Sequence, residues 1–311
     1  MPIVKPTEMN FSNKNIIIIL SGLPGTWKTS TALSADEVLL IDTDEGLARV
    51  NPAFRKDASI CKTYEEILAD IKEAKGKYKT IVIDTCGALI EYMKDWAMRT
   101  DPKASKTNGG FSLQGYGVIK SEFVRLSAEL RKYFNVIYIF HESMTKSGDD
   151  GVFYELVVEG SARTLVYQPA DLAGHLFIDH GKHYIGFTPT EQYSAKSAYG
   201  IKGIIEIPEL KDGEPNDFLA RLFAKVRENL NAESKALAPE KEKYDAAMSQ
   251  AKEVCAAVNK PEDVAPAAQF IKSIDHALTS EKEATAMLKA RISELGIIWN
   301  KANRTYEYKA E

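Results

Sequence analysis

The sequence SGLPGTWKTS at residues 21–30 follows the apolar run Ile16–Leu20 and matches the pattern G-x-x-x-x-G-K-[ST] at every defining position but one. A buried strand would deliver this loop, and its small residues would let backbone N–H groups surround phosphate oxygens. A helix beginning at Lys28 would face the anion with its positive end. The sequence therefore predicts a nucleotide-binding loop. Its expected members are Gly22, Leu23, Pro24, Gly25, Thr26, Trp27, Lys28, Thr29 and Ser30.

Two side chains of the loop have expected roles. Lys28 would reach the β- and γ-phosphates, and the Thr29 hydroxyl would hold Mg²⁺. The one departure from the pattern is Trp27, which stands where the motif has glycine. A bulky ring at this position must point away from the phosphates. The alternative is a degenerate loop that binds nucleotide poorly or not at all.

Carboxylates end two later apolar runs. The run Thr80–Ile83 leads into Asp84, the expected Walker B residue, which binds Mg²⁺ directly or through water. The run Val38–Ile41 leads into an acidic segment, and a carboxylate just beyond the γ-phosphate can act as general base toward water. We expect Asp44 in that role and Glu45 as the second choice. The alternatives are a helix-capping aspartate and solvated turn carboxylates.

Length and composition limit the possible classes. A chain of 311 residues has room for a core of about 230 residues and a small appendage. The net charge of −4 gives no global nucleic-acid signature, so any DNA contact must be local. The three cysteines show no C-x-x-C spacing, which predicts no zinc site and a reducing compartment. Because no apolar run approaches the length of a membrane span, we expect a soluble, cytoplasmic protein.

Strand and helix signals alternate over the first half of the chain. The expected elements are strands at 16–20, 38–41, 80–84 and 136–140, and helices at 64–75, 87–98 and 115–133. Such alternation predicts an α/β fold with a mostly parallel central sheet. Segments 174–178, 183–187 and 203–207 are expected to add strands at one edge, and a helix at 215–230 closes the core.

The C-terminal part of the chain differs from the first half in its pattern of apolar residues. Residues 232–239 have the composition of a polar linker, which places a core at 1–231 and a helical module at 240–311. Apolar residues recur there at helical spacing in three groups, and the tail is expected to add a short hairpin. Acidic and basic residues are nearly balanced in this module. We therefore expect it to contact a protein partner or another copy rather than DNA.

These features together resemble a known family. The loop, the second strand with its acidic end, the strand Ile81–Asp84 and the run from Gly115 to Glu142 resemble the phage-type ATP-binding proteins of the RecA-like AAA group. That group includes phage single-strand annealing recombination ATPases. The resemblance covers residues 14 to about 230 and includes an unusually short interval between Lys28 and Val38. It implies a RecA-like P-loop core, ATP with Mg²⁺, single-stranded DNA as partner, and homo-oligomers in rings or filaments.

The resemblance also suggests roles for three residues. Asp44 occupies the place of the carboxylate that activates water, and His141 occupies the place of a polar residue that senses the γ-phosphate. Lys196 resembles the cation that recombinases insert into the ATP site of a neighbouring subunit; the family's usual second basic residue is Ala198 here. The alternatives are an ordinary hydrogen-bonded histidine and a solvated surface lysine.

DNA contacts are expected in the loops after the third and fourth strands. Segment 99–111 combines Lys103 and Lys106, which would meet phosphates, with Phe111, which would stack on a base. Segment 144–154, with Lys146, is the second candidate. Loops with lysine and glycine are often only solvated, and this is the alternative.

The expected function is DNA-stimulated hydrolysis of ATP by a protein that binds single-stranded DNA in recombination, with strand annealing as its outcome. A P-loop kinase for a small molecule is an alternative from another class. Such a kinase usually has an arginine-rich lid, and residues 100–114 contain no arginine. A nucleotide-gated interaction module with weak hydrolysis is a third interpretation, which Trp27 motivates.

Overall fold

The computed structural model describes residues 10–106, 109–147, 151–158, 166–211, 213–301 and 303–309, without the side chains of residues 147 and 234. Contacts divide the chain into two compact units. The larger unit is Asn13–Asn229, and the smaller unit contains Leu230–Glu311. The nucleotide-binding loop belongs to the larger unit.

The larger unit is built on a sheet that has nine strands within the described residues. They are β1 (Ile17–Gly22), β2 (Val38–Asp42), β3 (Asp57–Ser59), β4 (Thr80–Asp84), β5 (Asn135–Ser147), β6 (Gly151–Leu156), β7 (Leu172–Asp179), β8 (Lys182–Gly186) and β9 (Ile204–Ile207). The strand order is β3-β2-β4-β5-β1-β7-β8-β9, and β6 pairs with β5. Pairs from β3 to β7 are parallel, and β8, β9 and β6 are antiparallel to their partners. This confirms the mostly parallel α/β core.

The central strands are apolar because both of their faces are covered. All residues of β1, β2 and β4 are buried, as is usual for parallel strands between two helical layers. Their register brings the functional ends together, since Asp42 pairs with Asp84 and Gly22 pairs with His141. The carboxyl edge of the sheet is therefore where the predicted site must form.

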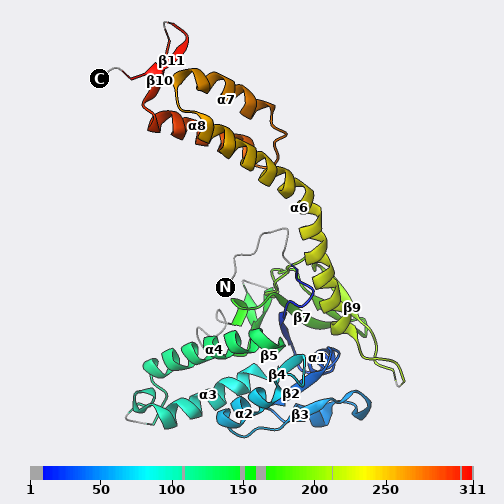
Figure 1. Cartoon of the computed structure of the whole chain (residues 1–311). Helices are drawn as coiled ribbons and strands as arrows, with labels where there is room; N and C mark the ends of the chain where they lie inside the picture. The colour runs from blue at the N-terminus through cyan, green and yellow to red at the C-terminus, as the bar shows by residue number, and fades with distance from the viewer. Residues whose placement is uncertain are drawn as a thin grey trace. The chain divides into compact units, whose positions relative to one another are not determined.

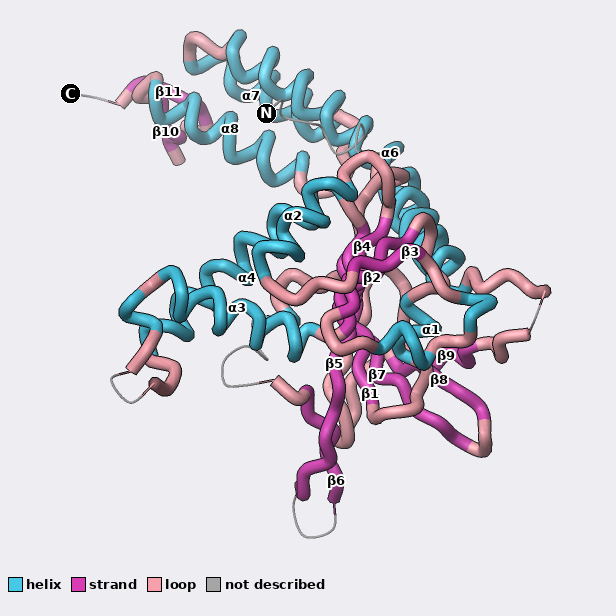
Figure 2. Tube along the Cα trace, turned by 90° about the horizontal axis from the view of Figure 1, so that it is seen from below, coloured by secondary structure: helices cyan, strands magenta, loops and turns pink. Residues whose placement is uncertain are grey.

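Helices cover both faces of this sheet. The helices of the larger unit are α1 (Lys28–Ala32), α2 (Tyr64–Ala74), α3 (Cys86–Thr100), α4 (Leu113–Tyr133) and the first part of α6 (Phe218–Ala257). Figure 2 shows α2, α3 and α4 on one face and α1 on the other. The side chains of Thr63, Thr85 and Ser112 accept hydrogen bonds from the first turns of α2, α3 and α4, which fixes where these helices begin. A core cluster with Tyr64, Tyr138 and other residues fills the space between these helices and the sheet.

The smaller unit contains the C-terminal part of α6, α7 (Pro261–Ser273), α8 (Ser280–Glu294) and the hairpin of β10 (Ile297–Asn300) and β11 (Thr305–Tyr308) (Figure 1). It has a core of its own, which includes Ala251, Ile271 and Leu288. The C-terminal helices agree with the expected fold. Within the described ranges, no helix is both long and apolar enough to span a bilayer.

Two segments differ from the sequence interpretation. Residues 232–239, expected as a linker, lie inside α6, because six of these eight residues are alanine, leucine, lysine or glutamate, which favour a helix despite Pro239. The boundaries at 231 and 240 stay predictions. The strand expected at 136–140 continues to Ser147, because its outer half pairs with β6. Segment 144–154, expected as a DNA loop, is therefore mostly a β-hairpin.

Candidate nucleotide site

The predicted loop and three later segments line one cavity of about 340 Å³ at the carboxyl edge of the sheet. The loop contributes Pro24, Gly25, Trp27, Lys28, Thr29 and Ser30. Asp44 follows β2, Asp84 ends β4, and His141 lies on β5. The structure therefore brings together the residues that the sequence predicted from four separate strands. Gly22, Leu23 and Thr26 belong to the loop but are not among the residues that line the cavity.

Lys28 is buried at the start of α1. Its Nζ donates hydrogen bonds to the carbonyl oxygens of Gly22 (3.0 Å) and Leu23 (2.8 Å). Burial lowers the pKa of the Lys28 ammonium, and the nearby charges of Asp84 and other carboxylates oppose this effect. Lys28 is thus held within the loop by uncharged carbonyl oxygens. Phosphate oxygens can replace them, because a hydrogen bond from an ammonium to a charged oxygen is stronger.

Trp27 has the left-handed backbone conformation that explains why this position of the motif is usually glycine. Its φ is 64°, a region that costs a residue with a Cβ about 1–2 kcal/mol. Its ring stacks on His183 of β8, with centroids 3.5 Å apart and planes 9° apart. The ring is thus held against strand β8, although Trp27 still lines the cavity.

Thr29 and Asp84 form a pair of oxygen ligands beside Lys28. The Thr29 hydroxyl donates to Asp84 Oδ2 at 2.5 Å. Burial raises the pKa of Asp84 to about 6, against the opposing effect of that hydrogen bond. Across the described part of the chain, no cluster of three or more His, Cys, Asp or Glu side chains forms a complete metal cage. A hydroxyl and one carboxylate beside a phosphate-binding loop fit Mg²⁺, which keeps waters and takes phosphate oxygens as its other ligands.

Asp44 lies between two positively polarised groups. Its Oδ2 is 3.6 Å from His141 Nε2, and its Oδ1 is 3.6 Å from Arg49 Nη2. The contact with His141, and then the charge of Arg49, hold the pKa of the Asp44 carboxyl below its ordinary value against the effect of burial. Asp44 is therefore ionised at neutral pH and can accept a proton.

Asp42 shapes the segment that carries Asp44. Its buried carboxylate accepts hydrogen bonds from the backbone N–H groups of Gly46 (2.8 Å) and Leu47 (3.0 Å). These bonds start the 3-10 turn η2 (Gly46–Arg49). Glu45 is exposed and does not line the cavity, so the geometry favours Asp44 as the base. The role of Glu45 stays a prediction.

The AAA domain family matches residues 14–199, which is more than half of the chain and includes every residue of the cavity. This chain belongs to the AAA domain family. A search of curated proteins found no matching sequence.

Solved structures similar to this AAA protein include the flagellar accessory protein FlaH from Methanocaldococcus jannaschii, with 14% identity over 63% of this chain and 90% of FlaH, at a TM-score of 0.31. Another is an ATPase from the type III secretion system of pathogenic bacteria, with 16% identity over 89% of this chain and 81% of that ATPase, at a TM-score of 0.36. At these TM-scores the two structures add nothing to the family assignment.

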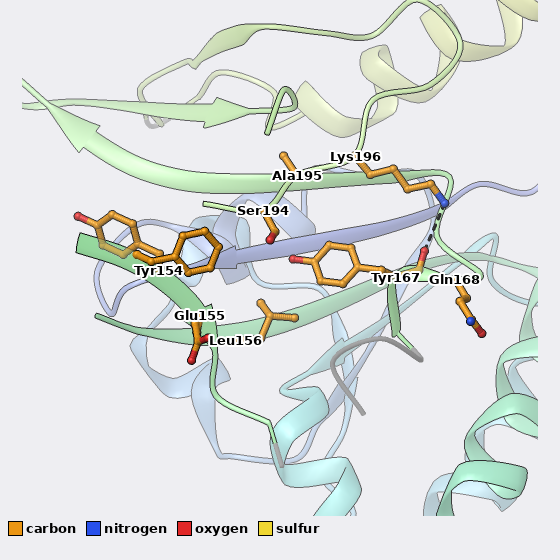
Figure 3. A pocket seen from close by; sticks show the side chains of 9 residues that line it. Tyr154, Glu155, Leu156, Tyr167, Gln168, Ser194, Ala195 and Lys196 are labelled. Carbon is orange, nitrogen blue, oxygen red and sulfur yellow. Dashed lines mark hydrogen bonds between the residues drawn. The ribbon is translucent and has the colours of Figure 1, made fainter. Parts of the chain in front are cut away.

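Lys196 of this AAA protein lies outside the P-loop cavity. It lines a second cavity of about 560 Å³ whose walls include Phe153, Tyr154 and Tyr167 (Figure 3). Its Nζ donates to the carbonyl oxygens of Tyr167 (3.2 Å) and Ala170 (2.5 Å). A role in the site of a neighbouring subunit stays a prediction, and it would require these two bonds to break.

The predicted DNA contacts differ in their exposure. Lys103, Lys106 and Lys146 are exposed, as phosphate contacts must be. The ring of Phe111 is half-buried and packs against the core cluster, with its centroid 5.0 Å from that of Tyr116 in an edge-to-face arrangement. Phe111 is therefore at least partly a core residue. Residues 107–108 of this segment lie outside the described residues.

Sequence reasoning missed three features of the site: Arg49, the His183 ring, and a buried histidine–glutamate pair behind the loop. In this pair His175 Nδ1 lies 2.8 Å from Glu142 Oε2, with side-chain exposures of 4% and 2%. Only the pair had a sequence signal, an acidic residue and a histidine inside apolar strands. Arg49 and His183 lie in segments whose spatial neighbours depend on turns and strand pairing.

Proposed function

We propose that this protein hydrolyses ATP at the P-loop with Mg²⁺ and couples hydrolysis to the binding of single-stranded DNA in recombination, with strand annealing as the outcome. One observation carries the ATPase part of the proposal: Lys28, Thr29, Asp44 and Asp84 line a single cavity. This set contains the phosphate cation, the two magnesium ligands and the base that phosphoryl transfer to water requires.

Each residue has a role that follows from its position. Lys28 exchanges the carbonyl oxygens of its own loop for β- and γ-phosphate oxygens. Thr29 and Asp84 would hold Mg²⁺, which neutralises charge on the phosphates. Asp44 takes a proton from water as the water oxygen bonds to the γ-phosphorus and the bond to the β–γ bridging oxygen breaks, which gives ADP and phosphate. His141 contacts Asp44 and lines the same cavity, so it is well placed to respond to the γ-phosphate.

The DNA part of the proposal is supported by exposed lysines near aromatic rings. Lys103 and Lys106 are exposed on the segment after α3, and Lys146 is exposed at the outer end of β5. Phe153 and Tyr154 of β6 line the second cavity, next to this end of β5. Lysines near aromatic rings suit a single strand, because lysines bind phosphates and rings stack on bases. The resemblance to recombination ATPases favours this ligand, assembly of copies into rings or filaments, and a cytoplasmic location.

ATP turnover measured with and without single-stranded DNA tests both parts. We expect the wild-type protein to release phosphate from ATP, and to do so faster with DNA. Lys28→Ala should abolish turnover, while Lys120→Ala, which changes an exposed lysine on α4, should leave it unchanged. Turnover that survives Lys28→Ala would refute the site, and turnover without any DNA binding would refute the DNA role alone.

A second candidate function rests on Trp27. A nucleotide-gated interaction module would bind ATP but hydrolyse it weakly, and the tryptophan in the glycine position of the loop favours this possibility. Equilibrium binding of ATP measured separately from turnover decides between the two. Tight binding with negligible turnover, with or without DNA, would favour the module.

A further inference from the structure

Arg49 lines the P-loop cavity together with Lys28, Thr29 and Asp44. We propose that Arg49 is a second cation of this site, which binds the terminal phosphate of the nucleotide from the same chain. This inference rests on the proposed ATPase function and adds a catalytic residue to it. No motif in the sequence indicated a role for this arginine.

The backbone holds Arg49 at the edge of the cavity. It is the last residue of η2, whose start is fixed by the two hydrogen bonds to the Asp42 carboxylate. Three side chains meet beside Gly46, in the same turn: a Cβ on Gly46 would lie 2.9 Å from Asp44 Oδ1, 3.3 Å from Arg49 Nη2 and 3.6 Å from Asp84 Oδ2. The polar side-chain atoms of Asp44, Arg49 and Asp84 therefore approach one point in the cavity. One of them, Asp84, is also an expected magnesium ligand.

The guanidinium of Arg49 is available for a ligand. Its side chain is 69% exposed, and within the described residues its closest charged partner is Asp44 at 3.6 Å, which is too long for a hydrogen bond. Asp44 Oδ1 likewise forms no hydrogen bond in the described part of the chain. Arg55, by contrast, donates to the carbonyl oxygens of Val50 (3.0 Å) and Ala48 (3.0 Å) and so has a structural role.

The chemistry of arginine suits the proposed contact. A planar guanidinium binds two phosphate oxygens at once and stays charged at any pH the protein meets. A terminal phosphate would draw Arg49 away from Asp44, and the same movement would leave Asp44 free to accept the proton of water. In the transition state, negative charge spreads over the oxygens of the transferred group, where a second cation beside Lys28 has its largest effect.

The test compares Arg49→Ala and Arg49→Lys with Arg221→Ala as a control, which changes an exposed arginine of α6. Arginines that contact the transferred phosphate contribute about 10³–10⁵-fold in kcat, so Arg49→Ala should lower turnover by about 10³-fold or more. The affinity for fluorescent ADP should stay within about threefold, because ADP has no terminal γ-phosphate, and Arg49→Lys should recover part of the rate. Turnover of Arg49→Ala within about threefold of the Arg221→Ala control would overturn the inference.

Mixing experiments test whether the cation acts within one chain. Arg49→Ala mixed with Lys28→Ala should regain no activity, because each chain then lacks part of its own site; rescue would place the cation in a neighbouring subunit and overturn the assignment. If the wild-type protein hydrolyses no ATP, the proposed function fails separately. The affinity for a non-hydrolysable ATP analogue, compared with the affinity for ADP, then tests the Arg49 contact by itself. Arg49→Ala should remove the preference for the analogue, and an unchanged preference would refute a contact between Arg49 and the terminal phosphate.

Discussion

The stack of Trp27 on His183 compensates for an unfavourable backbone at the phosphate-binding loop, and this balance can be measured. Trp27→Gly removes a left-handed non-glycine residue, which stabilises the fold by about 1–2 kcal/mol. It also removes an aromatic pair with centroids 3.5 Å apart, a contact type that contributes about 0.5–1.5 kcal/mol beyond burial. The two effects have opposite signs, so we expect Trp27→Gly alone to change the free energy of unfolding by no more than about 1.5 kcal/mol.

The same substitution should behave differently without its partner. In a His183→Ala background no stack remains to be lost, so Trp27→Gly should be more stabilising there than in the wild type, by about 0.5–1.5 kcal/mol. Urea unfolding followed by far-ultraviolet circular dichroism of the four proteins measures this coupling. His180→Ala serves as the control, because His180 is exposed on the same hairpin and its side chain is 91% accessible. A coupling within error of zero would show that the two rings are neighbours without mutual stabilisation.

Three further predictions concern catalysis and partners. Asp44→Asn should keep nucleotide binding and slow turnover by about 100-fold or more, as measured by phosphate release; normal turnover would place the base elsewhere. Lys103→Ala combined with Lys106→Ala should weaken single-stranded DNA binding and reduce the salt slope of its affinity by about 0.7 for each lost phosphate contact, whereas an unchanged slope would show that both lysines are only solvated. Lys196→Ala mixed with Lys28→Ala should regain part of the ATPase activity if Lys196 acts on a neighbouring subunit, and absence of rescue despite confirmed co-assembly would contradict that role.

The convergence of the P-loop, Asp84, Asp44 and His141 could be predicted because each of them follows, ends or lies within a buried parallel strand. Such strands present their carboxyl ends at one edge, so sequence order alone indicates which side chains meet. Arg49 could not be found this way, since its place depends on a short turn that the Asp42 carboxylate organises.

Contacts between segments that are distant in the chain also could not be predicted from the sequence. The ring of His183 reaches Trp27 only because β7 and β8 pair beside β1, and no local pattern specifies that meeting. Strand β6 was not predicted, although four of its six residues are apolar or aromatic, because among the described strands it pairs only with the outer half of β5, outside the parallel part of the sheet.

Strand β5 is long enough to belong both to the parallel sheet and to the outer hairpin with β6. Its first half lies in the parallel sheet and includes His141, and the same unbroken strand continues beside β6 to Ser147. At about 3.3 Å per residue, Lys146 lies roughly 17 Å along the strand from His141. Because no turn interrupts the strand, the backbone that carries His141 into the P-loop cavity is also the backbone that pairs with β6. A substitution chosen to alter the outer hairpin is therefore made on the strand that also positions His141.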